Sequence, residues 1–348
     1  MLRDLRLRDF RCFESLHFTP EPGLNFIIGA NAQGKTSILE AACVLLRLQS
    51  PKAGSLGETV RFGHAAFGLD GHWETRHLHL KYENALKSFA LDSKNQSRSG
   101  DYLSVARVAW IGNDDLQLVR GSGTHRRRYL DFLGAQVADG YLKTLRAYER
   151  ALRSRNALLK DNRPRREIAA FDQPLVEYGQ ALLDWRREFC AVLEPLIASA
   201  YTRISGGAET IQIEYVPGCN GDLRSALAAS LEEESRLRNT VAGPHRDDVR
   251  ILLGEKPAAI YASEGQQRSV ALALKLGQAA ELEASTQTPP LYLIDDVFGE
   301  LDPARRNNLM AALPPEAQKI ITSTTLDWHR SEMNGAIFQL ADSVLSRA

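Results

Sequence analysis

The sequence predicts an α/β fold, built on a mixed sheet with an antiparallel meander and interrupted by a mainly helical insert. Short apolar runs typical of strands fill about the first ninety residues. From about Arg126 the apolar period becomes helical, and the α/β pattern returns at Gly243. We therefore expect one α/β lobe formed by residues 1–120 and 240–348, and a helical inserted lobe at 121–239.

Two kinds of apolar pattern predict the strands. LNFII (24–28) and VARVAWI (105–111) are nearly uninterrupted apolar runs, which indicate buried strands, and the first of them leads into a glycine. After residue 57, the runs AAFGLDGHWE, RHLHLKYE and KSFALD alternate apolar and polar residues and are separated by Gly, Asn and Ser. We expect these three runs to form the antiparallel meander.

An amphipathic helix is expected in the first half of the insert, because apolar side chains share one face and basic side chains another. The apolar positions are Leu145, Tyr148, Leu152 and Leu159, and the basic positions are Lys143, Arg146, Arg150 and Arg153. Pro164 ends this segment. A second long helix is predicted through Trp185 to Ile204, then a strand at IQIEYV (211–216) and a helix around Leu223–Arg238. The insert is too short for a long coiled coil.

Charge is balanced over the whole chain but not along it. Lysines and arginines equal aspartates and glutamates at 43 each, yet from Thr124 to Arg166 there are twelve basic residues against four acidic ones. Such a block can bind a phosphate backbone, or it can be the solvated face of a helical domain. We assign DNA binding to the four basic residues of the helix, with the solvated face as the alternative.

The cell compartment follows from what the sequence does not contain. The N-terminus MLRDLRLRDF is charged and does not resemble a signal peptide, and no apolar run reaches the length of a membrane span. The cysteines are far apart and form no CxxC pair. These features predict a cytoplasmic protein without a membrane partner, a zinc site or a disulfide framework.

GANAQGKT (29–36) matches the phosphate-binding pattern G-x-x-x-x-G-K-[ST] at every fixed position, between an apolar strand and the helix-like run SILEAACVLL. Its glycines let backbone N–H groups curl around phosphates, its lysine reaches the β- and γ-phosphates, and its threonine hydroxyl ligates Mg²⁺. The motif predicts ATP and Mg²⁺ as ligands. The candidate binding residues are Gly29, Ala30, Asn31, Ala32, Gln33, Gly34, Lys35, Thr36 and Ser37.

PLYLIDDVFGELD (290–302) reads as a Walker B strand, with buried leucines and isoleucine followed by two carboxylates. Asp295, at the end of the strand, is placed to bind Mg²⁺ together with Thr36. Asp296 occupies the position from which a second carboxylate orients the attacking water. We take Asp296 and Lys35 as the candidate catalytic residues, although acidic residues after a strand can also cap the next element.

ASEGQQRSVALALKLGQAAEL (262–282) opens with Ser-x-Gly-Gln and continues as an amphipathic helix. In ABC-type ATPases the signature element has this form, and its first residues present N–H donors to a γ-phosphate. The alternative is an ordinary helix with Ser263 as its N-cap, which fits the same residues. The order P-loop, signature, Walker B nevertheless predicts an ABC-type P-loop ATPase head with an inserted helical lobe.

Longer segments make the resemblance closer. They are FRCF (10–13), GANAQGKTSILEA, DLQLVRGSGTHRRRYLDF, YERALRSRNALLK, GPHRDD (243–248), SEGQQRSVALALKL and IDDVFGELD. Together they resemble the RecF family, bacterial recombination-mediator ATPases related to the heads of SMC proteins. The resemblance runs in unbroken order from about residue 2 to Thr325.

This resemblance implies a homodimer in which two copies clamp two ATP molecules, each bound by the P-loop of one copy and the signature of the other. It implies that Ser263, Gly265 and Gln266 act on the partner's nucleotide, and that Arg11 adds a phosphate contact. It also implies slow, DNA-stimulated ATP hydrolysis and binding to gapped DNA with single- and double-stranded parts. The implied role is in repair, replication restart and the SOS response, where RecO and RecR help to load RecA.

The chain departs from the family pattern at several positions. Glu264 stands where the family usually has Gln, Cys12 replaces a common Asn, and Lys52 lies where an Arg is typical. FGELD replaces the usual leucine–serine–glutamate run after Walker B. None of these changes removes a catalytic group.

Three alternatives share the nucleotide motifs. A transporter-type ATPase subunit would usually present a histidine after the next strand, where this chain has TSTT (322–325). A nuclease-associated SMC-like ATPase would need a separate acidic metal cluster. The third alternative is a nucleotide-gated scaffold that does not hydrolyse ATP.

Overall fold

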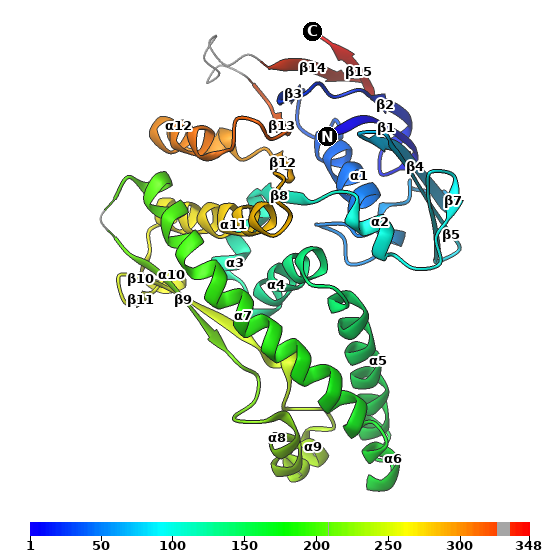
Figure 1. The fold of residues 1–348 in the computed structure, drawn as a ribbon, viewed down its shortest axis with the longest axis vertical. Coiled ribbons are helices and arrows are strands. Elements are labelled where there is room, and N and C mark those ends of the chain that lie inside the picture. The colour runs from blue at the N-terminus through cyan, green and yellow to red at the C-terminus, as the bar shows by residue number, and fades with distance from the viewer. Residues whose placement is uncertain (208, 326–334) are drawn as a thin grey trace. The chain divides into compact units, whose positions relative to one another are not determined.

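The computed structural model of the chain describes residues 1–207, 209–325 and 335–348 (Figure 1). The chain divides into two compact units: the first comprises residues 1–115, 203–205 and 274–348, and the second comprises residues 116–202 and 206–273. Two of the boundaries between the units fall inside helices, α7 (Asp172–Ser205) and α11 (Glu264–Thr286).

One sheet of the first unit is antiparallel, with strand order β2-β1-β4-β5-β6-β7. The strands are β1 (Leu2–Phe10), β2 (Phe13–Phe18), β4 (Ala66–Trp73), β5 (Arg76–Glu83), β6 (Leu86–Leu91) and β7 (Lys94–Asn95). In β1, Leu5 and Leu7 are buried and the residue between them faces outward. In β4, Leu69 is buried in the same alternating way. The predicted meander is confirmed, because β4 pairs antiparallel with β5 and β5 with β6.

The other sheet of the first unit is mixed, with strand order β15-β14-β3-β13-β12-β8. All its pairings are parallel except that of β15 with β14. The strands are β3 (Leu24–Ile28), β8 (Val108–Gly112), β12 (Leu291–Asp295), β13 (Lys319–Ser323), β14 (Ala336–Ala341) and β15 (Val344–Arg347). β8, β12 and β13 are buried at every residue, as expected for parallel strands covered on both faces.

Helix α1 (Lys35–Arg47) contacts strands of both sheets (Figure 1). Its partners are β1, β4 and β5 in the antiparallel sheet and β8, β12 and β13 in the mixed sheet. Every residue from Ile38 to Arg47 is buried, because the helix is covered on two sides. The P-loop therefore leads into a helix fixed in the core. The unit also contains α2 (Gly100–Ser104) and α12 (Pro303–Ala312).

The second unit is mainly helical, as expected. Its helices besides α7 and the start of α11 are α3 (Leu116–Arg120), α4 (Gly123–Val137), α5 (Tyr141–Lys160), α6 (Arg165–Ala169), α8 (Leu223–Ala229), α9 (Leu231–Leu237) and α10 (Ala258–Tyr261). The prediction of a single helix around Leu223–Arg238 is wrong, because the structure has two short helices there, α8 and α9. The Ser230 hydroxyl donates to the Ala226 carbonyl at the junction of α8 and α9, a local bond that competes with helix continuation. Among the described helices, none is long and apolar enough to cross a membrane.

The second unit also holds a three-stranded antiparallel sheet of β9 (Ile211–Val216), β10 (Asp248–Leu253) and β11 (Lys256–Pro257). This sheet explains why the unit extends to residue 273, past the boundary at 239 expected from sequence. β10 pairs with β9 along its whole length, and Arg126 in α4 forms an ion pair with Asp248 at 2.6 Å. Pairing of strands, rather than a change in apolar pattern, assigns residues 248–253 to this unit.

Candidate nucleotide site

The P-loop and the Walker B carboxylates lie at one edge of the mixed sheet. β3, β13, β12 and β8 are parallel neighbours in that order, so their carboxyl ends meet. In open α/β sheets this edge is where ligands bind. Asp295 in β12 is level with Thr322 in β13 and with Gly112 in β8, and β3 ends where the P-loop begins.

Two P-loop glycines are required by their surroundings. Gly34 has φ of 101°, and a Cβ there would lie 2.6 Å from Cys12 Sγ. A Cβ at Gly29 would lie 2.5 Å from the backbone oxygen of Leu340. A side chain at either position would force the loop away from its support, so the tight curve of the loop depends on these glycines.

Lys35 lies across the inside of the P-loop. Its Nζ donates to the carbonyl oxygens of Gly29 at 2.7 Å and Ala30 at 2.9 Å, and the side chain is 6 % exposed. Burial lowers the pKa of this ammonium, while Asp296 and Asp295 act in the opposite direction. Two neutral carbonyl oxygens of the loop thus hold the cation.

The Asp295 carboxylate is 5 % exposed and receives several donors. Its Oδ1 accepts from the Thr36 hydroxyl at 2.7 Å and from the Thr322 hydroxyl at 3.0 Å, while Lys52 Nζ lies 3.4 Å from its Oδ2. Lys52 also forms an ion pair with Asp114 at 3.0 Å. A hydroxyl and a carboxylate beneath a phosphate-binding loop are the oxygen donors that Mg²⁺ prefers, so this donor set fits Mg²⁺.

Asp296 has an unusual backbone for a residue other than glycine, with φ of 53°. Its N–H donates to the Thr322 hydroxyl at 3.0 Å, and its carbonyl oxygen accepts from the Asn113 amide at 3.2 Å. These bonds hold a conformation that L-residues adopt rarely and that occurs often at functional sites. Burial raises the pKa of the Asp296 carboxyl, as do the neighbouring acidic groups, whereas Lys35 lowers it.

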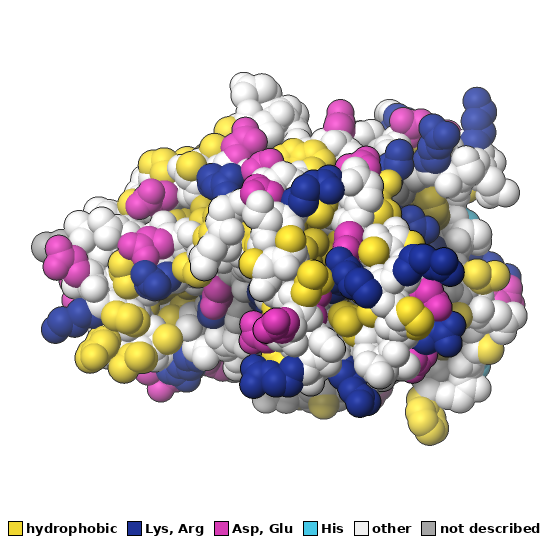
Figure 2. All heavy atoms as spheres, turned by 90° about the horizontal axis from the view of Figure 1, so that it is seen from below, with side chains coloured by type: hydrophobic (Ala, Val, Ile, Leu, Met, Phe, Trp, Pro, Cys, Tyr) yellow, Lys and Arg dark blue, Asp and Glu magenta, His cyan; other side chains and the backbone are white. Residues whose placement is uncertain are grey.

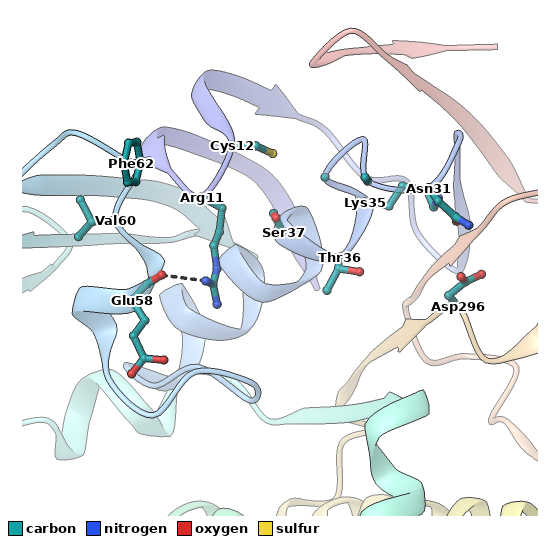
Figure 3. Close-up of a pocket in the computed structure, with 12 residues that line it drawn as sticks. Arg11, Cys12, Asn31, Lys35, Thr36, Ser37, Glu58, Val60, Phe62 and Asp296 are labelled. Carbon is teal, nitrogen blue, oxygen red and sulfur yellow. Dashed lines mark hydrogen bonds between the residues drawn. The ribbon is translucent and has the colours of Figure 1, made fainter.

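A cavity of about 590 Å³ joins these groups to the start of the antiparallel sheet (Figure 3). It is lined by Arg11, Cys12, Asn31, Ala32, Gly34, Lys35, Thr36, Ser37, Glu58, Val60, Phe62 and Asp296. In Figure 3, Lys35, Asn31 and Asp296 lie at one end, and Val60 and Phe62 at the other. Ala30 is exposed on the loop, and Gln33 Oε1 accepts from the Asp342 N–H at 3.1 Å.

Arg11 lines the cavity, but its guanidinium donates to protein groups. Nε and Nη2 each donate at 2.7 Å to the buried Glu40 carboxylate, and Nη1 donates at 2.8 Å to the Glu58 carbonyl (Figure 3). The hydrogen bonds with Glu40 raise the pKa of Arg11. A phosphate contact by Arg11 would have to share this guanidinium with its bidentate partner.

The signature residues form a capping box at the start of α11, in the second unit. The Ser263 hydroxyl accepts from the Gln266 N–H at 3.3 Å, and Gln266 Oε1 accepts from the Ser263 N–H at 2.7 Å. Glu264 is exposed and forms an ion pair with Arg268 at 3.0 Å along the helix. Gly265 lies in the first turn of α11, and the Gln266 side-chain amide donates to the Glu209 carboxylate at 2.8 Å.

Comparisons with known proteins agree with this geometry. A family model described as an AAA domain matches residues 4–106. The "DNA replication and repair protein RecF" of Lactococcus lactis subsp. cremoris is 31 % identical over 99 % of this chain and 99 % of its own. That of Anaeromyxobacter sp. is 35 % identical over 99 % of this chain and 98 % of its own. The chain belongs to the RecF family.

Solved structures place the fold in the same family. A structure of the recombination mediator protein RecF with ATP, from the RecFOR pathway, superposes with a TM-score of 0.89 at 27 % identity, over 100 % of this chain and 97 % of that one. An SMC head bound to the C-terminal winged-helix domain of ScpA superposes with a TM-score of 0.56 over 100 % of this chain and 96 % of that chain. Its sequence identity is 14 %, so this likeness concerns the fold alone. The predicted ABC-type ATPase head with an inserted helical lobe is confirmed.

The basic stripe of this RecF-family chain, defined as Lys143, Arg146, Arg150 and Arg153, is exposed at all four positions of α5. Arg153 makes a weak ion pair with Glu149 at 3.9 Å. Other basic residues of the same segment are structural, since Arg155 is 0 % exposed and Arg126 pairs with Asp248. Figure 2 shows one face of the molecule, on which basic and acidic side chains are interspersed rather than gathered by sign.

Several residues around the RecF-family site were not expected from sequence. Thr322 and Asn113 hold Asp295 and Asp296; Thr322 is the residue before the last in β13, and Asn113 directly follows β8. That position is the signal that could have identified them, because the ends of neighbouring parallel strands converge. Phe62 and Val60 lie in the loop before β4, whose sequence carries no nucleotide motif.

Proposed function

We propose that this protein is an ATP-dependent DNA-binding protein of recombinational repair and replication restart. One observation supports this most strongly. Thr36 and Asp295 lie 2.7 Å apart beside a cavity lined by Lys35 and Asp296, at the sheet edge where ABC-type heads bind nucleotide. Membership of the RecF family supports the biological setting, because its relatives carry the name of DNA replication and repair proteins.

In this proposal the P-loop N–H groups bind the ATP phosphates at the start of α1, where the helix dipole favours negative charge. Lys35 leaves the carbonyl oxygens of Gly29 and Ala30 and binds the β- and γ-phosphates, which are stronger partners. Thr36 and Asp295 hold Mg²⁺, which neutralises charge on the phosphates when bound. Lys52 then gives up the Asp295 oxygen and keeps its ion pair with Asp114.

Hydrolysis would depend on Asp296. Its carboxylate lines the same cavity as Lys35, and its backbone is held by Thr322 and Asn113, so the side chain can orient a water molecule toward the γ-phosphate. We propose that hydrolysis is slow and is stimulated when DNA binding and dimer closure reorganise the site.

The signature would complete the site of a second copy. Ser263, Gly265 and Gln266 lie at the start of α11, where the helix dipole favours an anion, and the capping bonds of the Ser263 and Gln266 N–H groups would open to bind phosphate. Two copies closing over two ATP molecules would present these groups to each other's γ-phosphates. The closed dimer would bind DNA with single- and double-stranded parts, such as a gap, through surfaces that include the basic stripe.

The partners proposed are RecO- and RecR-type mediator proteins, with which the dimer would help to load the recombinase. The RecFOR pathway named for the solved ATP-bound relative supports this choice. A nucleotide-gated scaffold without turnover is the second candidate, and the measurement of phosphate release distinguishes it from an ATPase.

Calorimetry and phosphate release test the proposal together. Lys35→Ala should abolish measurable ATP binding, because the phosphates lose the buried cation of the loop. Lys94→Ala, which removes an exposed lysine of β7, should bind ATP like the wild type. Wild-type protein should also release phosphate faster with gapped DNA. Unchanged ATP binding by Lys35→Ala would disprove the nucleotide site, and ATP binding without any phosphate release would favour the scaffold.

A further inference from the structure

The position of the Phe62 side chain is not explained by packing within its own chain. The side chain is 100 % exposed, yet it lines the cavity that contains the P-loop (Figure 3). Burial of a phenylalanine ring stabilises a fold, and the fully exposed ring of Phe62 makes no such contribution in the single chain. A fully exposed ring beside a charged cavity indicates a partner that binds there.

The backbone that carries Phe62 is fixed on both sides. Val60 forms a bridge with Phe10, and the Arg61 N–H donates to the Asp9 carbonyl at 2.9 Å. The Arg61 side chain adds an ion pair with Glu14 at 3.2 Å, and the His64 N–H donates to the Arg61 carbonyl at 3.0 Å. The ring therefore stands on an ordered loop that holds it outward, a preorganised arrangement that lowers the entropic cost of binding.

The two ends of the cavity differ in chemistry. Lys35, Thr36 and Asp296 provide the charged end, whereas Val60 and Phe62 provide an apolar and aromatic end (Figure 3). A nucleoside triphosphate has the same division, with an anionic chain at one end and a flat aromatic base at the other. Aromatic side chains stack on bases because each base has a π-face, and this recognition is tolerant of base identity.

We infer that Phe62 is a base-stacking residue of the nucleotide site. The inference rests on the proposed function, namely that the P-loop cavity binds ATP. Phe62 contacts the base while Lys35 and Thr36 hold the phosphates, so it contributes to affinity for nucleosides but not for phosphate chains. A different use of the same ring, as a contact with a second copy of this chain, is an outcome of the test below.

Two probes separate base from phosphate binding: ATP and inorganic tripolyphosphate, each with Mg²⁺ and measured by calorimetry. Phe62→Ala should weaken ATP binding about 5- to 100-fold, the usual cost of losing a base-stacking ring. Tripolyphosphate affinity should not change, and Phe62→Tyr should bind ATP like the wild type. Leu86→Ala is the matched control, because Leu86 is 75 % exposed in β6. It should leave both affinities unchanged.

A spectroscopic test reports the contact directly. In Phe62→Trp, ATP should quench the fluorescence of the new indole and tripolyphosphate should not, measured against the wild-type background. Leu86→Trp should show neither change. Equal ATP affinity in Phe62→Ala and wild type would overturn the inference. If the dimer of Phe62→Ala were also weakened, the ring would instead contact a second copy of this chain. Failure of wild-type protein to bind either probe would instead contradict the proposed function.

Discussion

Asp295 shows how single residues define this site. The carboxylate accepts hydrogen bonds from Thr36 of the P-loop and Thr322 of the neighbouring strand, and it faces the ammonium of Lys52. A carboxylate that is 5 % exposed needs such partners, because an unpaired buried charge is costly. Two hydroxyl groups and one lysine thus orient the proposed Mg²⁺ ligand.

Asp296→Asn is predicted to separate binding from turnover. The amide keeps the size of the carboxylate but cannot accept a proton from water, so phosphate release should fall about 10²- to 10⁴-fold. ATP affinity by calorimetry should stay close to that of the wild type. Glu300→Gln removes a nearby carboxylate that also bonds to Asn113, and it should hydrolyse ATP nearly normally. Wild-type turnover in Asp296→Asn would show that Asp296 is structural.

At the scale of elements, one buried arginine ties the helical unit together. Arg155 in α5 is 0 % exposed and donates to Asp172 in α7 at 2.9 Å, to Glu234 in α9 at 2.6 Å and to the Thr240 hydroxyl at 2.9 Å. Three segments distant in sequence therefore meet at one guanidinium. The positive charge of this residue belongs to the interior of the unit rather than to a binding surface.

Arg155→Met should lower the free energy of unfolding by about 3–5 kcal/mol, because it leaves Glu234 buried without its partner. Denaturant unfolding followed by circular dichroism measures this loss. Adding Glu234→Leu should recover much of it, since the uncompensated charge is then gone. Arg153→Met, on the exposed face of the same helix, should change stability by less than about 0.5 kcal/mol. Equal losses in the two single variants would refute the role of Arg155.

The basic stripe on α5 is predicted to bind DNA backbone once the dimer has closed. Each phosphate neutralised contributes about −0.9 to the slope of log K against log salt. Arg146→Ala with Arg150→Ala should therefore flatten the slope by roughly 2 and weaken all DNA sequences alike. Arg236→Ala with Arg238→Ala, exposed residues at the end of α9, should change neither. Unchanged affinity and slope in the stripe variant would assign DNA binding to another surface.

Local sequence patterns were sufficient to predict those parts of the site whose structure is determined by a single segment. The P-loop letters, the apolar run of β3 and the final Asp295 of β12 predicted the phosphate end of the site. Contacts between distant segments could not be predicted in this way. The positions of Thr322 and Asn113 depend on strand order in the mixed sheet, and the contact of Lys52 with Asp295 joins residues far apart in the sequence, so no single segment encodes them. The inclusion of β10 in the second unit likewise depends on pairing with a distant strand.

At the scale of the whole molecule, the P-loop and the signature belong to different compact units of one chain. Gly29 to Ser37 lie in the first unit, and Ser263 to Gln266 lie in the second. The proposed dimer uses this division, because each nucleotide would be bound by the first unit of one copy and the second unit of the other. In this proposal, ligand binding would join two copies only when the γ-phosphate is present.

Ser263→Arg should bind ATP as a monomer but fail to dimerise. The arginine adds bulk at the start of α11, while the P-loop in the same chain is untouched. The substitution also removes an N-cap, which costs about 1 kcal/mol, so a thermal melt must first show a folded protein. ATP affinity by calorimetry then serves as the second control. Normal ATP-dependent dimers in this variant would contradict the trans site.

The most direct test of the account is the mass of the wild-type protein, measured by light scattering after gel filtration with ATP and Mg²⁺ or with ADP and Mg²⁺. We predict twice the mass of the 38.6 kDa chain with ATP and the mass of a single chain with ADP. A single-chain mass with ATP, under conditions where calorimetry shows the site saturated, would contradict the nucleotide-gated dimer.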